Sequence, residues 1–115
     1  MPYPTRSRLC LALGLGLAAL AAGCTGAADT GLEPVACPTD NTLTYANFGE
    51  QWVADNCLEC HAGDESPRLD TQAAIQQRTS QLLHEAVYTT AMPEDKDLSL
   101  DTRKQFGEWL ACGAL

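Results

Sequence analysis

Three stretches of the chain repeat apolar residues at the three-to-four-residue spacing of amphipathic helices. They run from about 44 to 60, from about 70 to 88 and from about 99 to 112. In chain order the apolar positions are Phe48, Trp52, Val53, Cys57, Cys60, Ala74, Ile75, Leu82, Leu83, Ala86, Val87, Phe106, Trp109 and Leu110. No stretch alternates apolar and polar residues for long enough to predict a strand. We therefore expect an all-α domain with three main helices.

Each predicted helix begins at a residue whose side chain accepts a hydrogen bond from the first turn. The candidate caps are Thr44 or Asn47, then Asp70 or Thr71, and finally Ser99. Gly113 stands where the third helix would stop.

The first 24 residues are different in character. Arg6 and Arg8 precede a short apolar run, which is typical of a secretory signal, because a bilayer-spanning helix needs about 20 apolar residues. The run ends in LAAGC at Cys24, which resembles the lipobox of bacterial lipoproteins. The resemblance implies cleavage after residue 23 and a lipid on Cys24, and Thr25 in the next position favours the outer membrane. The alternative is an ordinary signal peptide with a cysteine near its cleavage site.

Residues 24–43 are rich in Gly, Pro, Thr, Ala and Asp and lack helical periodicity. We interpret them as a flexible tether between the lipid and the domain. The chain is thus expected to divide into a signal peptide (1–23), a lipidated tether (24–43) and a single domain (44–115).

The chain is acidic. Its 115 residues carry a net charge of −8, and removal of 1–23 takes away two arginines, which leaves 5 basic and 15 acidic residues, or −10. Such a charge disfavours binding to nucleic acid. It suits a protein partner with a basic docking patch, although acidity also simply keeps a small exported protein soluble.

The six cysteines fall into four groups. They are Cys10, Cys24, Cys37, Cys57, Cys60 and Cys112. Cys10 leaves with the signal, Cys24 is the lipidation candidate, and Cys57 and Cys60 belong to one motif. Cys37 and Cys112 remain, and in an exported protein we expect them to form a disulfide. The alternative is a pair of unpaired buried thiols.

Cys57 and Cys60 stand three apart, with His61 directly after them. The Cys-x-x-Cys-His pattern is typical of covalent haem attachment. Thiols three apart on a helical turn face the same way and can both reach the vinyl groups of one porphyrin edge, while the next histidine reaches the iron. A structural zinc usually needs four ligands, often from two such motifs, but there is no second Cys-x-x-Cys and His84 is the only other histidine. A thioredoxin-like dithiol would begin a helix after a strand, which this pattern does not predict.

At this point the chain resembles the class I cytochromes c, over residues 44–112 and through the motif Cys57-Leu58-Glu59-Cys60-His61. Two further points of similarity precede the motif: Gly49 lies eight positions before it, and Val53 stands where the family often has an aromatic residue. Two more follow the motif: the stretch Pro67-Arg68-Leu69, and the residues Phe106, Trp109 and Leu110 of the last helix. The resemblance implies a small fold of three main helices around one covalent haem c. It also implies that the carbonyl of Pro67 accepts the ring N–H of His61.

Met92 precedes Pro93 in a turn-rich segment and resembles the family's second axial ligand. His84 is the competing ligand, and if neither bound, the sixth position of the iron would be open. Only 31 positions separate His61 from Met92, which is short for the family, so we expect an exposed haem edge.

The resemblance implies an electron carrier rather than an enzyme, with His61 and Met92 on the iron. It would be exported, anchored in the outer membrane by lipid, and face the periplasm, where it would exchange electrons with redox proteins. The alternative is a haem enzyme or sensor with an open or displaceable sixth site, as in a peroxidase. Phe48, Trp52 and Trp109 would shield the ring or pack the helix crossing.

Overall fold

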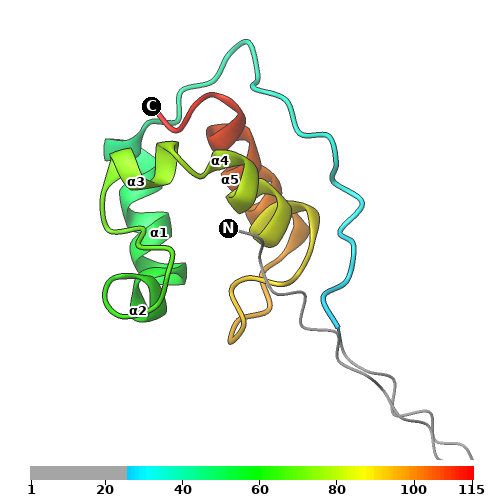
Figure 1. The fold of residues 1–115 in the computed structure, drawn as a ribbon. Helices are drawn as coiled ribbons and strands as arrows, with labels where there is room; N and C mark the ends of the chain where they lie inside the picture. The colour runs from blue at the N-terminus through cyan, green and yellow to red at the C-terminus, as the bar shows by residue number, and fades with distance from the viewer. Residues whose placement is uncertain (1–25) are drawn as a thin grey trace, which may run out of the picture.

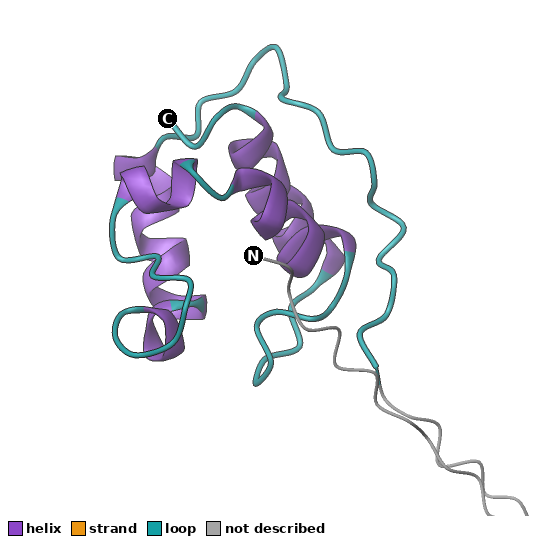
Figure 2. Cartoon of the chain, viewed as in Figure 1, coloured by secondary structure: helices purple, strands orange, loops and turns teal. Residues whose placement is uncertain are grey.

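The computed structural model describes residues 26–115, so the expected signal sequence and the expected lipidation site at Cys24 lie outside the described residues. The helical elements are η1 (Tyr45–Gly49), α1 (Glu50–Asn56), α2 (Leu58–His61), α3 (Gln72–Gln76), α4 (Thr79–Leu82), η2 (Leu83–Tyr88) and α5 (Leu100–Ala111). The described part of the chain contains no strand, only one isolated bridge between Asp29 and Thr89, so the expected all-α class is confirmed (Figure 2).

The first predicted helix is a nearly continuous run of η1, α1 and α2. Of the two candidate caps, Thr44 is the one used: its side chain accepts from the N–H of Asn47 at 3.2 Å, and the Asn47 side chain accepts from the N–H of Thr44 at 2.7 Å. The run is interrupted at Cys57, whose φ and ψ are −127° and −37°. The cysteine motif therefore begins at this break, and α2 carries the rest of it.

The second predicted helix is divided in the structure. Thr71 caps α3, and the chain leaves helical geometry at Arg78, with φ −128° and ψ 18°, before α4 and η2 continue. The two parts have different partners. The side chains of Gln72 and Gln76 in α3 donate to the carbonyl of Ala114, whereas α4 and η2 lie along α5 (Figure 1). These contacts, which local periodicity does not reveal, explain the break.

The third predicted helix is α5. As expected, Ser99 caps it by accepting from the N–H of Thr102 at 3.1 Å. Its predicted apolar face is buried, with Phe106, Trp109 and Leu110 each no more than 2% exposed.

The aromatic residues of the first run and α5 form the centre of the core. The rings of Trp52 and Phe106 are stacked with centroids 3.6 Å apart, and Phe48 meets Trp109 edge to face at 6.0 Å. Gly49 lies directly against the Trp109 ring, so that a Cβ at this position would overlap it. The first run and α5 therefore approach each other closely at Gly49.

The segment before the first helix lies on the domain from Ala28 onward. The N–H of Thr30 donates to the carbonyl of Tyr88, and that of Thr90 donates to the carbonyl of Ala28, both at 2.9 Å. Leu32 also packs against the hydrophobic core, as do Val35 and Leu43. Figure 1 shows this segment running along the outside of the helices before it enters η1. Residues 28–43, which composition led us to expect as a tether, thus make contacts with the helical domain.

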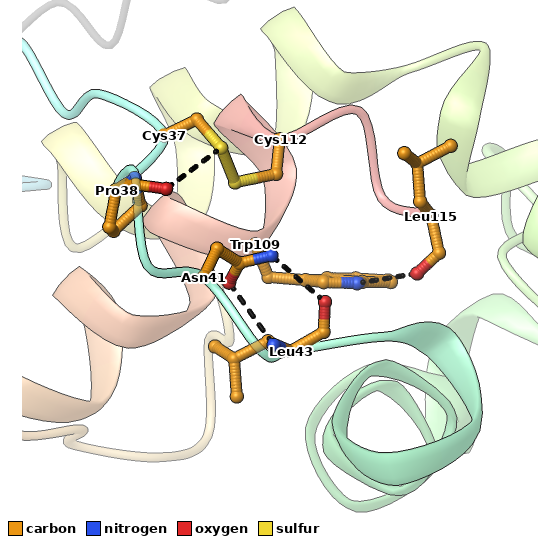
Figure 3. The surroundings of a disulfide bond; sticks show 7 residues. All are labelled: Cys37, Pro38, Asn41, Leu43, Trp109, Cys112 and Leu115. Carbon is orange, nitrogen blue, oxygen red and sulfur yellow. Dashed lines mark hydrogen bonds between the residues drawn. A yellow bond between two sulfur atoms is a disulfide. The ribbon is translucent and has the colours of Figure 1, made fainter.

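The expected disulfide between Cys37 and Cys112 is present, with the two Cα atoms 4.7 Å apart. It joins the segment before the first helix to the end of α5, as Figure 3 shows. Beside it the indole Nε1 of Trp109 donates to the carbonyl of Leu115 at 3.3 Å. The disulfide therefore ties the segment before the first helix to the C-terminal end of α5, next to the helix crossing.

None of the helices between residues 26 and 115 is both long enough and apolar enough to span a bilayer.

Candidate functional site

Two adjoining cavities lie between the α1–α2 end of the first run and the loop that follows η2. Figure 1 shows these two segments at its lower side. Their volumes are about 180 and 160 Å³. All four haem-site residues expected from the sequence, Cys57, Cys60, His61 and Met92, line the first cavity. Three of them, without Cys60, also line the second. The structure thus brings together residues that are up to 35 positions apart in the sequence (92 − 57).

His61 is held in a defined orientation. Its Nδ1 lies 2.9 Å from the carbonyl oxygen of Pro67. Because a carbonyl oxygen only accepts, the proton of the neutral ring belongs on Nδ1, and Nε2 keeps its lone pair. A backbone hydrogen bond also closes the short loop after His61: the N–H of Leu69, a buried residue, donates to the carbonyl of His61 at 2.9 Å. His61 therefore presents a ring nitrogen that is available to a metal.

The two motif cysteines are free thiols in different surroundings. Cys57 is half-buried, and burial raises its pKa to about 12, with Lys96 acting weakly in the opposite direction. Cys60 is exposed. Desolvation is the main cause that raises its pKa, and it is reinforced by the carboxylates of Glu65, Asp95, Glu59 and Glu94. Neither thiol is in the electropositive setting that activates the nucleophile of a thiol oxidoreductase.

Met92 is fixed through both of its backbone polar groups. Its N–H donates to the carbonyl of Glu85 at 2.8 Å, and its carbonyl accepts from Nη1 of Arg103 at 2.7 Å. Pro93, which follows, is buried. Because Met92 also lines both cavities, the loop holds this residue at the same place as His61 and Cys57.

His84, the competing ligand, lies elsewhere. Its side chain is 67% exposed, and its Nδ1 lies 3.2 Å from a carboxylate oxygen of Glu85. It lines neither cavity. The structure therefore does not bring His84 to the other candidate ligands.

Trp52 carries an unsatisfied donor at the site. It lines the second cavity, and its indole Nε1 is buried without a hydrogen-bond partner in the structure. Buried donors are nearly always paired, so such an atom is expected to have a partner in the working protein. An anionic or carbonyl acceptor on a molecule in the cavity would supply one.

Two features of the site were not anticipated from the sequence. The first is a rim of carboxylates around the first cavity, which is lined by Asp55, Glu59, Glu65, Glu94 and Asp95 with Lys96. The second is Arg103, which is 1% exposed and reaches the backbone of Met92. The signal for Arg103 was available: it stands three residues before Phe106 and seven before Leu110, on the apolar face of its helix.

Comparison with known protein families, characterised proteins and solved structures found no match for this chain. Between residues 26 and 115, no group of three or more His, Cys, Asp or Glu side chains is arranged to hold a metal ion.

Proposed function

We propose that the chain is a monohaem c-type cytochrome, similar to those of class I, that carries single electrons. The observation that supports this most is the convergence of Cys57, Cys60, His61 and Met92 on one pair of cavities. The bond from the His61 ring to Pro67 adds to it, because it leaves Nε2 available as a ligand. The buried, unpaired Nε1 of Trp52 fits a group with acceptor atoms in the second cavity.

Each residue of the proposed site has one task. The thiols of Cys57 and Cys60 would add across the two vinyl groups of haem, each forming a carbon–sulfur bond while its hydrogen passes to the vinyl carbon. His61 would bind the iron through Nε2, and Met92 through its thioether. When bound, the haem supplies one-electron chemistry through the ferric and ferrous states of its iron. The protein itself would convert no substrate.

The surroundings of the site suit electron transfer. Trp52 lines the second cavity, and the ring of Phe106 is stacked on it. Cys60, in contrast, is exposed, so the edge near it would face solvent. An exposed edge allows close approach of a partner, and the carboxylate rim would favour a redox partner with a basic docking patch.

A haem enzyme or sensor would need an open or displaceable sixth position. Both backbone polar groups of Met92 are held by hydrogen bonds, which supports a filled position and hence the electron carrier. A bis-histidine site through His84 is disfavoured by the exposure of that residue.

We further propose that the protein is exported and anchored by lipid on Cys24, in the outer membrane and facing the periplasm. The disulfide between Cys37 and Cys112 supports export, since disulfides persist in oxidising compartments.

The test is spectroscopic. The protein is matured in an export-competent host with a haem attachment system, and the wild type is compared with Met92→Ala and the matched control His84→Ala. The proposal predicts a covalent haem and a weak far-red methionine–iron band that is lost in Met92→Ala and retained in His84→Ala. A high-spin wild-type spectrum that responds to peroxide would favour the enzyme or sensor, and loss of the band in His84→Ala would overturn the assigned ligand.

A further inference from the structure

Arg103 is the only charged side chain that is buried between residues 26 and 115. It lies on α5 and is 1% exposed, among residues that are otherwise apolar. Burying a guanidinium is costly unless its donors are paired. Its contacts therefore indicate what the residue does.

The contacts of Arg103 are all to backbone carbonyls near the distal loop. Nη1 donates to the carbonyls of Ala86 and Met92, each at 2.7 Å, and lies 3.4 Å from that of Thr89. Nε has no partner. The side chain thus links the end of η2 to the loop at the residue that lines both cavities.

We propose that Arg103 is a positioning residue that holds Met92 in place as the sixth ligand of the iron. This inference rests on the proposed cytochrome function. Met92 is clamped from two sides: the carbonyl of Glu85 fixes its N–H, and the guanidinium of Arg103 fixes its carbonyl. With both backbone groups held, the thioether keeps its place at the cavities.

The clamp has a measurable thermodynamic effect. An internal ligand competes with any external one, and the apparent affinity for the external ligand falls as the internal ligand spends more time in place. Imidazole is a suitable external probe because it binds haem iron directly. Loosening the loop should therefore raise the affinity for imidazole before it affects the covalent haem.

Three variants separate positioning from general stability. Arg103→Met removes the charge and the donors at similar length, and Arg103→Lys keeps a charge and a donor but not the planar fork. Gly107→Ala is the control, because a Cβ there would come within 2.7 Å of Val87 Cγ1 and disturb the packing of α5 on η2 while the guanidinium of Arg103 is retained. All are prepared as exported holoprotein and titrated with imidazole.

We expect Arg103→Met to bind imidazole about tenfold or more tightly than wild type and to weaken or lose the far-red band. The imidazole affinity of Arg103→Lys should lie between those of the wild type and Arg103→Met. Gly107→Ala should lower the unfolding temperature and leave the imidazole affinity within about twofold of wild type.

Wild-type affinity and an unchanged band in the Arg103 variants would overturn the inference. So would a shift in Gly107→Ala as large as that in Arg103→Met, because the effect would then be general loosening. If Arg103→Met does not accumulate, Arg103→Lys decides by the same two readouts. A wild type without haem overturns the proposed function and this inference together, whereas haem without an effect of Arg103 overturns this inference alone.

Discussion

At the scale of single residues, the site contains two thiols that differ in accessibility and in acidity. Cys60 is exposed, whereas Cys57 is half-buried and its pKa is raised to about 12. The thiolate is the reactive form, so near neutral pH very little of Cys57 can react. The difference in thiol reactivity does not depend on a cofactor, so it can be measured in the haem-free protein.

In haem-free protein with the Cys37–Cys112 disulfide intact, we predict that iodoacetamide labels Cys60 well before Cys57. The rate at Cys57 should climb as the pH is raised toward its pKa, because the thiolate fraction grows. Peptide mapping by mass spectrometry gives both rates. Equal labelling, or fast labelling of Cys57 at neutral pH, would indicate an activated dithiol and favour a thiol oxidoreductase.

The sequence predicted Cys57, Cys60, His61 and Met92 as site residues from their spacing and neighbours, and the structure brings all four to one cavity. It did not predict the burial and contacts of Arg103 or the unpaired Nε1 of Trp52. Both depend on burial and on hydrogen bonds between segments that are distant in the chain, such as Arg103 with Met92. Local patterns do not contain these contacts.

At the scale of elements, the crossing of the first run and α5 depends on a glycine, which has no side chain at the point of closest approach. Gly49 lies against the ring of Trp109, and a Cβ at this position would overlap that ring. Neither backbone can move away easily, because Trp52 and Phe106 are stacked one turn further along.

We predict that Gly49→Ala lowers the free energy of unfolding by roughly 1–3 kcal/mol, the usual cost of overpacking a core. Gly63→Ala is the matched control, because no atom lies within 4 Å of a Cβ at that position. Urea unfolding followed by tryptophan fluorescence compares the two. A Gly49→Ala protein as stable as wild type would show that the crossing is loose.

Helix starts were more predictable than helix continuity. Ser99 caps α5 as expected, and Thr44 and Thr71 were each one of two candidates. Capping is local, so a few neighbouring residues determine it. The break at Arg78 was not predicted, because it follows from the different partners of α3 and α4 rather than from any breaking residue.

At the scale of the whole molecule, the disulfide closes a large loop. Cys37 and Cys112 are 75 positions apart, and the bond fixes the segment before the first helix against α5. Small domains depend on such links because their cores are thin.

We predict that the double variant Cys37→Ser, Cys112→Ser loses roughly 4–5 kcal/mol of free energy of unfolding. The reason is that the disulfide closes a long loop and so lowers the conformational entropy of the unfolded chain. Thermal unfolding of the oxidised protein, the reduced protein and the variant provides the measurement. Oxidised and reduced protein that unfold at the same temperature would contradict it.

The contacts of residues 28–30 also limit how far the domain can move from the lipid that we propose on Cys24. Only five positions separate Cys24 from Asp29 (29 − 24), which pairs with Thr89. A chain of that length spans at most roughly 18 Å. The domain should therefore lie close to the bilayer surface rather than range away from it on a long tether.

Neutron reflectometry of the lipidated protein on a supported bilayer tests this. The prediction is a protein layer next to the headgroups, and a gap that widens when ten Gly/Ser residues are inserted after Gly26. A wide water gap in the wild type would show that the contacts of residues 28–30 open at the membrane.

The central claim is that Cys57 and Cys60 hold one haem covalently. Intact-mass spectrometry of the exported protein under denaturing conditions, with the absorbance spectrum recorded on the same sample, tests it most directly. The account predicts a mass increase of one haem and a Soret band, both of which disappear in Cys57→Ala, Cys60→Ala. A wild-type protein from a host that attaches haem to a control cytochrome, but with no added haem mass and no Soret band, would contradict it.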